Sequence, residues 1–140
     1  MAAPAFYSDS ALTTVATTVI ARQRSDGTSA PVKVRLWIGS TAAGWKHRVA
    51  ANPGVDTIQI SVTDTTTGSG HATTEVKLAL TEAGLATATA GALLDIGATQ
   101  ILSEAVNAVS FWVEINDATH VVGTATELGL ITNELATDPV

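Results

Sequence analysis

The chain has 140 residues, of which 46% are hydrophobic, 4% aromatic and 14% charged, and its formal net charge is −6. This length is typical of one domain with a sizeable core, and the apolar content is too high for a disordered chain. The absence of cysteine excludes disulfides, thiolate metal ligands and a cysteine nucleophile. No apolar run approaches the ~18 residues that span a bilayer, so we expect no membrane partner.

The charges are unevenly distributed along the chain. Residues 1–48 carry six basic and two acidic side chains, a net +4, whereas residues 49–140 carry Lys77 alone against eleven acids, a net −10. If the fold preserves this segregation, a basic patch would suit acidic protein neighbours or a second copy of the chain. If folding mixes the charges on the surface, no such patch forms. The sequence leaves both outcomes open.

The first predicted elements lie before residue 32. Residues 1–11 are expected to form an extended N-terminal arm that carries Phe6 and Tyr7. Residues 12–21 place apolar side chains at helical spacing, yet seven of these ten residues are β-branched, which favours a strand. The turn sequence at 25–27 predicts a hairpin that leads into the next strand.

Four later segments alternate apolar and polar residues with the period of a half-buried strand. These segments are residues 32–38, 58–62, 75–80 and 109–115. Weaker strand candidates are residues 93–96, 100–102, 121–122 and 128–132. Turn sequences at 52–54 and 65–70 separate strands, and residues 81–85 predict one short helical turn.

The pattern predicts an all-β protein. We expect a single antiparallel β-sandwich, immunoglobulin-like or jelly-roll-like, of about seven strands with extended terminal arms. The predicted organisation is an N-terminal arm at 1–11, a sandwich domain at 12–135 and a C-terminal tail at 136–140.

A search for catalytic and metal-binding motifs finds no candidate. His47, His71 and His120 lie in three separate loop-like stretches without the spacing of a metal-binding pair. No nucleophile elbow, phosphate-binding loop, zinc-protease motif or calcium loop is present. We therefore predict no enzymatic activity, catalytic residue, metal ligand or cofactor. The acidic net charge also makes a nucleic-acid partner unexpected.

The tryptophans are the strongest candidates for an interaction surface. Strand alternation places Trp37, with Lys33 and Arg35, and likewise Trp112 on faces opposite the predicted core. Exposed tryptophan beside charge is typical of protein interfaces, but a bulge, a covering loop or burial on both faces would hide the rings. Trp45, in a predicted loop with basic neighbours, is a further candidate. The candidate interface residues are Phe6, Tyr7, Arg22, Arg24, Lys33, Arg35, Trp37, Trp45 and Trp112.

Three segments resemble small virion proteins of tailed bacteriophages. Residues 32–38 resemble their V-x-L-W-I strand, residues 75–85 their K-L-A-L-x-x-A-G-L segment, and residues 98–115 their closing V-x-F-W-V-x-V strand. The resemblance implies an immunoglobulin-like β-sandwich, and a non-enzymatic decoration or cement protein that binds and stabilises the capsid lattice.

The same resemblance implies partners and a location. The partners would be the major capsid protein or other virion proteins, with self-association of the chain, and the location would be the virion, assembled in the bacterial cytoplasm. The N-terminal arm would be a strap that adds a strand to a neighbouring subunit. One alternative is a tail, collar or fibre component. Another is a carbohydrate- or cell-surface-binding module that uses Trp37 and Trp45 as stacking platforms.

Overall fold

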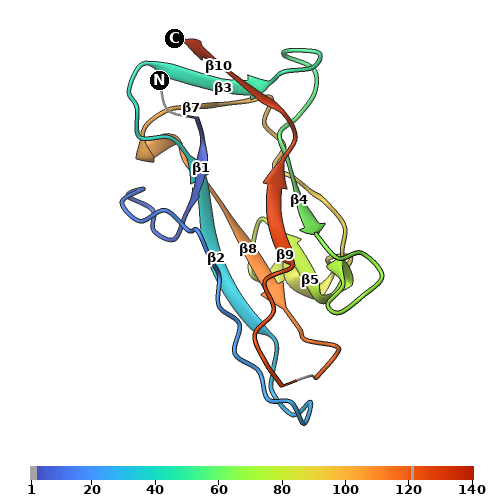
Figure 1. Ribbon diagram of the computed structural model, residues 1–140. Coiled ribbons are helices and arrows are strands. Elements are labelled where there is room, and N and C mark those ends of the chain that lie inside the picture. Colours follow the sequence, from blue (N-terminus) through green and yellow to red (C-terminus); the bar gives the residue numbers. More distant parts are fainter. Residues whose placement is uncertain (1–2, 121) are drawn as a thin grey trace.

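The computed structural model describes residues 3–120 and 122–140, and within them it has ten strands and three short 3-10 helices (Figure 1). The strands are β1 (Ala5–Tyr7), β2 (Val32–Gly39), β3 (Trp45–Val49), β4 (Gln59–Asp64), β5 (Val76–Ala79), β6 (Leu94–Asp95), β7 (Gln100–Leu102), β8 (Val109–Ile115), β9 (Leu128–Thr132) and β10 (Leu135–Pro139). The helices are η1 (Thr73–Glu75), η2 (Ala83–Ala86) and η3 (Ala105–Asn107). The predicted all-β class is confirmed, with ten strands rather than about seven. No helix in the described part of the chain is long and apolar enough to cross a membrane.

The strands form three antiparallel sheets. One sheet has four strands in the order β1-β2-β8-β5, and two have three strands, in the orders β6-β4-β9 and β10-β3-β7. The two smaller sheets adjoin where β9 passes into β10. At their junction the N–H of Ala50 donates to the carbonyl of Glu134, and the N–H of Asn133 donates to that of Gln59. They therefore make one bent layer, in which β3 and β10 cross one end of the sandwich (Figure 1).

The core lies between the four-stranded sheet and the bent layer. Its largest fully buried apolar side chains are Phe111, Leu36, Ile38, Ile58 and Ile60, which come from both layers. The buried apolar residues alternate along the strands, at Leu36 and Ile38 in β2 and at Phe111 and Val113 in β8, as the sequence pattern predicts. Burial of each large apolar side chain stabilises the fold by about 1.5–3 kcal/mol.

The predicted strand at 12–21 is absent from the structure. Residues in this segment make one isolated bridge, between Tyr7 and Val15, and the turn at 25–27 joins no hairpin. The Asp9 carboxylate accepts the N–H groups of Thr13 and Thr14, at 3.0 and 2.7 Å, and so satisfies their backbone in a turn. Ile20 is 68% exposed. A β-branched run has strand preference only where a half-buried pleated surface accepts it. Here Ala16 and Val19 pack against the core, but beyond the Tyr7–Val15 bridge the segment pairs with no strand.

Both predicted terminal arms contain strands. Residues Ala5–Tyr7 pair with β2 at the edge of the four-stranded sheet, although residues 1–2 lie outside the described part. The expected tail at 136–140 instead contributes to β10, which pairs with β3. Trp45, expected in a loop, is the first residue of β3. Of the weak strand candidate at 121–122, Val121 lies outside the described residues and Val122 is in no strand.

Candidate functional site

The outer face of the four-stranded sheet carries most of the sequence-predicted interface residues. The register places these side chains in three cross-strand rows, which are Tyr7–Trp37–Ser110, Arg35–Trp112–Ala79 and Lys33–Glu114–Lys77. Alternation along each strand points these positions away from the core. The predicted orientation of Trp37 and Trp112 is therefore present, and their role in an interface stays a prediction.

Arg35 links the first two rows. Its guanidinium lies 5.0 Å from the centroid of the Trp37 ring and donates a 3.0 Å hydrogen bond to the hydroxyl of Ser110. A cation–π contact at an exposed site contributes about 0.5–1 kcal/mol. Arg35 is exposed, whereas Trp37 and Trp112 are half-buried. The rings are thus neither free in solvent nor part of the core.

Two covering elements flank these tryptophans. At one side lies Leu12, which is 3% exposed. A Cβ added to Gly39 would lie only 3.0 Å from the Leu12 side chain. At the other side η2 buries Leu85, and a Cβ on Gly84 would lie 3.2 Å from that of Ala79. Both glycines permit a close approach that a larger residue would block. The outer face is therefore partly covered at both edges, and a strip between the covers holds the tryptophans and basic residues.

Tyr7, already placed in the first row, and Phe6 are held within the chain. Tyr7 is buried, and the half-buried Phe6 packs edge-on against Phe111, with ring centroids 5.7 Å apart. The expected strap is therefore paired with its own β2.

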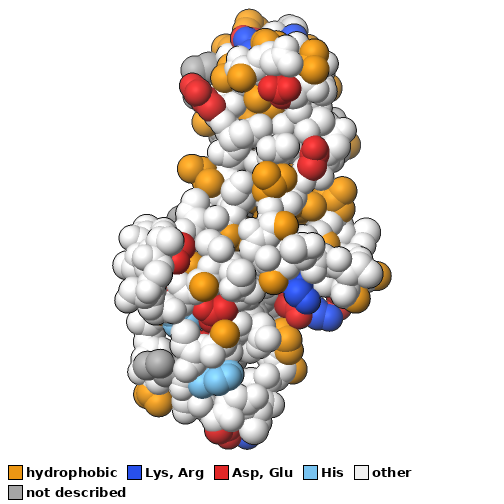
Figure 2. All heavy atoms as spheres, turned by 90° about the vertical axis from the view of Figure 1, so that its right-hand side faces the viewer, with side chains coloured by type: hydrophobic (Ala, Val, Ile, Leu, Met, Phe, Trp, Pro, Cys, Tyr) orange, Lys and Arg blue, Asp and Glu red, His pale blue; other side chains and the backbone are white. Residues whose placement is uncertain are grey.

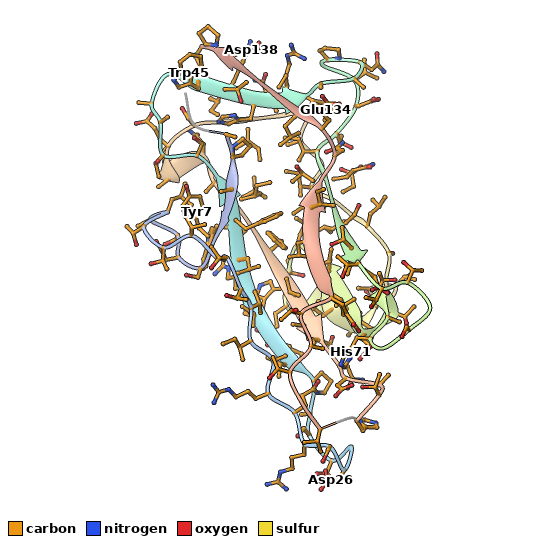
Figure 3. All side chains as sticks on the ribbon, in the orientation of Figure 1. Tyr7, Asp26, Trp45, His71, Glu134 and Asp138 are labelled. Atoms are coloured by element: carbon orange, nitrogen blue, oxygen red, sulfur yellow. The ribbon has the colours of Figure 1, made fainter. Side chains whose placement is uncertain are left out.

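Other candidates lie far from the strip. Arg22 and Arg24 are exposed in the segment before β2 that also contains Asp26, at one end of the molecule. Trp45 is half-buried at the opposite end, where it pairs with Pro139 of β10 (Figure 3). The nine predicted interface residues thus do not form a single patch.

The basic residues of the first third are likewise divided. Arg48 in β3 pairs with Asp138 at 2.6 Å, which offsets one positive charge at that end. Figure 2 views the molecule from the side of β4 and shows basic side chains next to acidic ones. The basic residues of the first third therefore do not gather in one patch, although Lys33 and Arg35 share the outer face with Lys77.

A second cluster, which the sequence did not predict, surrounds His71. Its Nδ1 lies 2.9 Å from Oε1 of Glu75 and 3.5 Å from Oδ1 of Asp117. Glu75 ends η1, Asp117 follows β8, and His71 precedes η1. Glu127, just before β9, accepts the backbone N–H of His71. Three segments that are distant in sequence therefore meet at one imidazole.

Backbone donors fix the carboxylates of this cluster. The two oxygens of Glu75, which is 5% exposed, accept N–H groups of Ala72 at 2.6 Å and Ala118 at 2.8 Å. Asp117 Oδ1 accepts the N–H of Thr119 at 2.8 Å and that of His120 at 3.2 Å. The side chains are consequently oriented before any ligand arrives.

The electrostatics of the cluster favour positive charge on His71. The hydrogen bond to Glu75 raises the pKa of His71 against the opposing effect of burial, and the charges of Asp117 and Glu127 act in the same direction as the bond. Burial would raise the pKa of Asp117, but its hydrogen bonds and the charge of His71 together lower it. The one signal in the sequence was the four-residue spacing of His71 and Glu75, because Asp117 follows more than forty residues later.

The other buried histidine has a different environment. His47 is 0% exposed, and its Nδ1 lies 2.9 Å from the Thr137 hydroxyl. Its Nε2 is buried without a hydrogen-bond partner among the described residues. Burial, which disfavours the charged ring, lowers the pKa of His47.

Comparisons of the chain with protein-family models, curated proteins and solved structures give no match. The fold is that of an all-β, sandwich-like protein, with an outer strip of aromatic and basic side chains and a separate histidine–carboxylate cluster. Its function is accordingly inferred from these residues.

Proposed function

We propose that this chain is a non-enzymatic structural protein of a bacteriophage virion, which binds and stabilises the capsid lattice as a decoration or cement protein. The contact surface is the strip on the outer face of the four-stranded sheet. The resemblance to small virion proteins supports the proposal, because residues 32–38, 75–85 and 109–115 supply the adjacent strands β2, β5 and β8.

The observation that carries the proposal is the arrangement of Arg35, Trp37 and Trp112. Arginine and tryptophan are the residues most often responsible for binding energy at protein interfaces, where truncation of one anchor costs about 2 kcal/mol or more. Here an exposed arginine lies over one half-buried indole and is paired across the strands with another. The geometry presents a rigid, partly apolar surface.

The charge of the strip indicates the kind of partner. Its rows contain three basic side chains, Lys33, Arg35 and Lys77, and one acidic side chain, Glu114, although the whole chain has a net charge of −6. A locally basic face on an acidic protein complements an acidic surface of the major capsid protein or another virion protein. Repetition over a lattice adds avidity to each modest contact.

A binding assay with purified shells that lack the protein tests the proposal. Trp37→Ala, Trp112→Ala and Arg35→Glu are expected to abolish co-sedimentation with the shells while circular dichroism shows a folded domain. Arg35→Glu changes an exposed side chain, so it separates loss of binding from loss of folding. Arg22→Glu, also exposed but outside the strip, is the matched control and should bind as the unmodified chain does. Normal binding by all three strip variants would refute the proposal.

Copy number separates the head from the tail alternatives. A decoration protein is present in purified particles in numbers comparable to the capsid subunits, whereas a collar or fibre component is present in few copies. Quantitative mass spectrometry of particles makes this distinction. Two observations weaken the glycan-binding alternative, in which sugars stack on Trp37 and Trp45. Arg35 already lies over the Trp37 ring, and Trp45 lies near the far end of the fold.

A further inference from the structure

We propose that His71, Glu75 and Asp117 bind a divalent transition-metal cation of the zinc type, a site independent of the lattice-binding strip. One donor atom from each residue lies within 4.8 Å of the other two. Two ligands of one tetrahedral zinc ion, each about 2.0–2.2 Å from the metal, lie about 3.3–3.6 Å apart. Nδ1 of His71 lies 3.5 Å from Oδ1 of Asp117, within that range, and 2.9 Å from Oε1 of Glu75, a hydrogen-bond distance that an ion in place of the proton would widen.

The cluster differs from a group of solvated surface acids. The side chain of Glu75 is only 3% exposed, and those of His71 and Asp117 are about one-fifth exposed. The imidazole Nδ1 points between two carboxylate oxygens whose positions are set by backbone N–H donors. Ligands fixed in this way lose little freedom on binding an ion.

The charge of the cluster also favours a cation. Glu75, Asp117 and Glu127 surround a single imidazole, and in the described part of the chain no lysine or arginine forms an ion pair with any of them. Even with His71 protonated, the group carries a net negative charge. A metal ion would take the place of the proton on Nδ1, between Glu75 and Asp117, and would bring two positive charges.

The donor set selects the class of metal. A neutral imidazole nitrogen together with carboxylate oxygens suits zinc and similar ions, whereas calcium and magnesium prefer sites built from oxygen alone. Glu127 would act as a positioning residue, because it accepts the backbone N–H of His71 and also the Thr66 hydroxyl, the latter at 2.9 Å. A bound ion would tie residues 65–75 to the segment that follows β8.

The experiment uses the full chain without an affinity tag, stripped with a chelator and titrated with zinc chloride. Isothermal titration calorimetry is expected to show one saturable zinc per chain, and the melting temperature should rise with zinc. His71→Asn and Asp117→Asn should each weaken zinc binding by about 10- to 100-fold or more, the cost usual even for loss of an indirect metal partner. Asp117→Asn keeps the Oδ1 acceptor of Thr119 and His120, so the local turn is retained.

His120→Asn is the matched control. It removes a histidine three residues from Asp117 that lies outside the cluster and is exposed, so zinc binding should be unchanged. Far-ultraviolet circular dichroism of the metal-free variants verifies that all are folded. The proposal is overturned if the chain binds no zinc, if His71→Asn binds as tightly as the unmodified chain, if His120→Asn loses binding equally, or if calcium or magnesium competes with zinc at equal concentration.

Discussion

The two faces of the four-stranded sheet are made by the same strands and have opposite character. On the inner face Leu36, Ile38, Phe111 and Val113 are each at most 3% exposed. On the outer face tryptophans are half-buried beside exposed basic side chains such as Arg35. Since successive residues of a strand point to opposite sides, one stretch of sequence specifies a core and an outer surface independently. Substitutions on the two faces should therefore separate stability from binding.

The largest effect is expected from the inner face at Phe111. Phe111→Ala removes a ring that is 0% exposed and that packs against Phe6, so it should lower the free energy of unfolding by about 3–5 kcal/mol. Phe111→Leu retains most of the apolar volume and should cost clearly less. Urea denaturation followed by tryptophan fluorescence measures both. A loss below about 1 kcal/mol for Phe111→Ala would contradict the assignment of this face as the core.

An intermediate effect is expected where the outer face has its own buried residue. Leu85→Ala should lower the free energy of unfolding by about 2 kcal/mol, because Leu85, in η2, is 1% exposed. Leu80, five residues earlier and 43% exposed, is the matched control, and Leu80→Ala should change stability by no more than about 0.5 kcal/mol. Equal effects in the same denaturation assay would mean that η2 does not cover the sheet.

The smallest effect concerns a polar side chain on the core side of β3. Burial lowers the folded-state pKa of His47 below its ordinary value of 6.5, so the unfolded chain binds a proton more readily. The contribution of His47 to stability is therefore complete above pH 6.5 and is lost as the pH falls below that value. The expected result is a drop in melting temperature between pH 7.5 and pH 5.

His47→Gln isolates this contribution, since it removes the titrating ring and should flatten that part of the pH profile. His71 acts in the opposite sense. Because its folded-state pKa is raised, its contribution is complete below pH 6.5 and declines as the pH rises through the folded-state value. The melting temperatures of the unmodified chain and of His47→Gln are compared at each pH in the presence of a chelator. Because His71 is present in both proteins, its contribution cancels in the difference. An identical pH profile for both proteins would contradict the expectation.

The sequence predicted the central strands well and the flanking segments poorly. Residues 32–38 and 109–115 alternate strictly, and both form strands because a matching sheet buries their apolar face. Residues 12–21 are richer in β-branched side chains, seven of ten against three of seven in each of those strands, but they pair with the sheet only at the Tyr7–Val15 bridge. The residues of β10 carry no strong pattern, and their strand depends on pairing with β3, ninety positions away. Local sequence carries no information about such a partner.

The candidate sites also show that local sequence does not reveal contacts with distant segments. The outward orientation of Trp37 and Trp112 followed from alternation alone, whereas their covers, Leu12 and Leu85, follow from tertiary packing. The His71 cluster escaped prediction because its ligands come from two segments, 71–75 and the stretch after β8, more than forty residues apart in the sequence. Spacing rules detect sites built on one element, and a site assembled between loops has no fixed spacing.

The end of β10 affects how copies of this protein can meet. β10 is an edge strand of its sheet, and it finishes with Asp138 and Pro139. Proline offers no N–H to an incoming strand, and a charge at an edge opposes backbone pairing between molecules. This edge therefore disfavours the repeated strand addition that leads to amyloid-like growth. Ordered assembly at high local concentration would depend on side-chain surfaces rather than on backbone pairing.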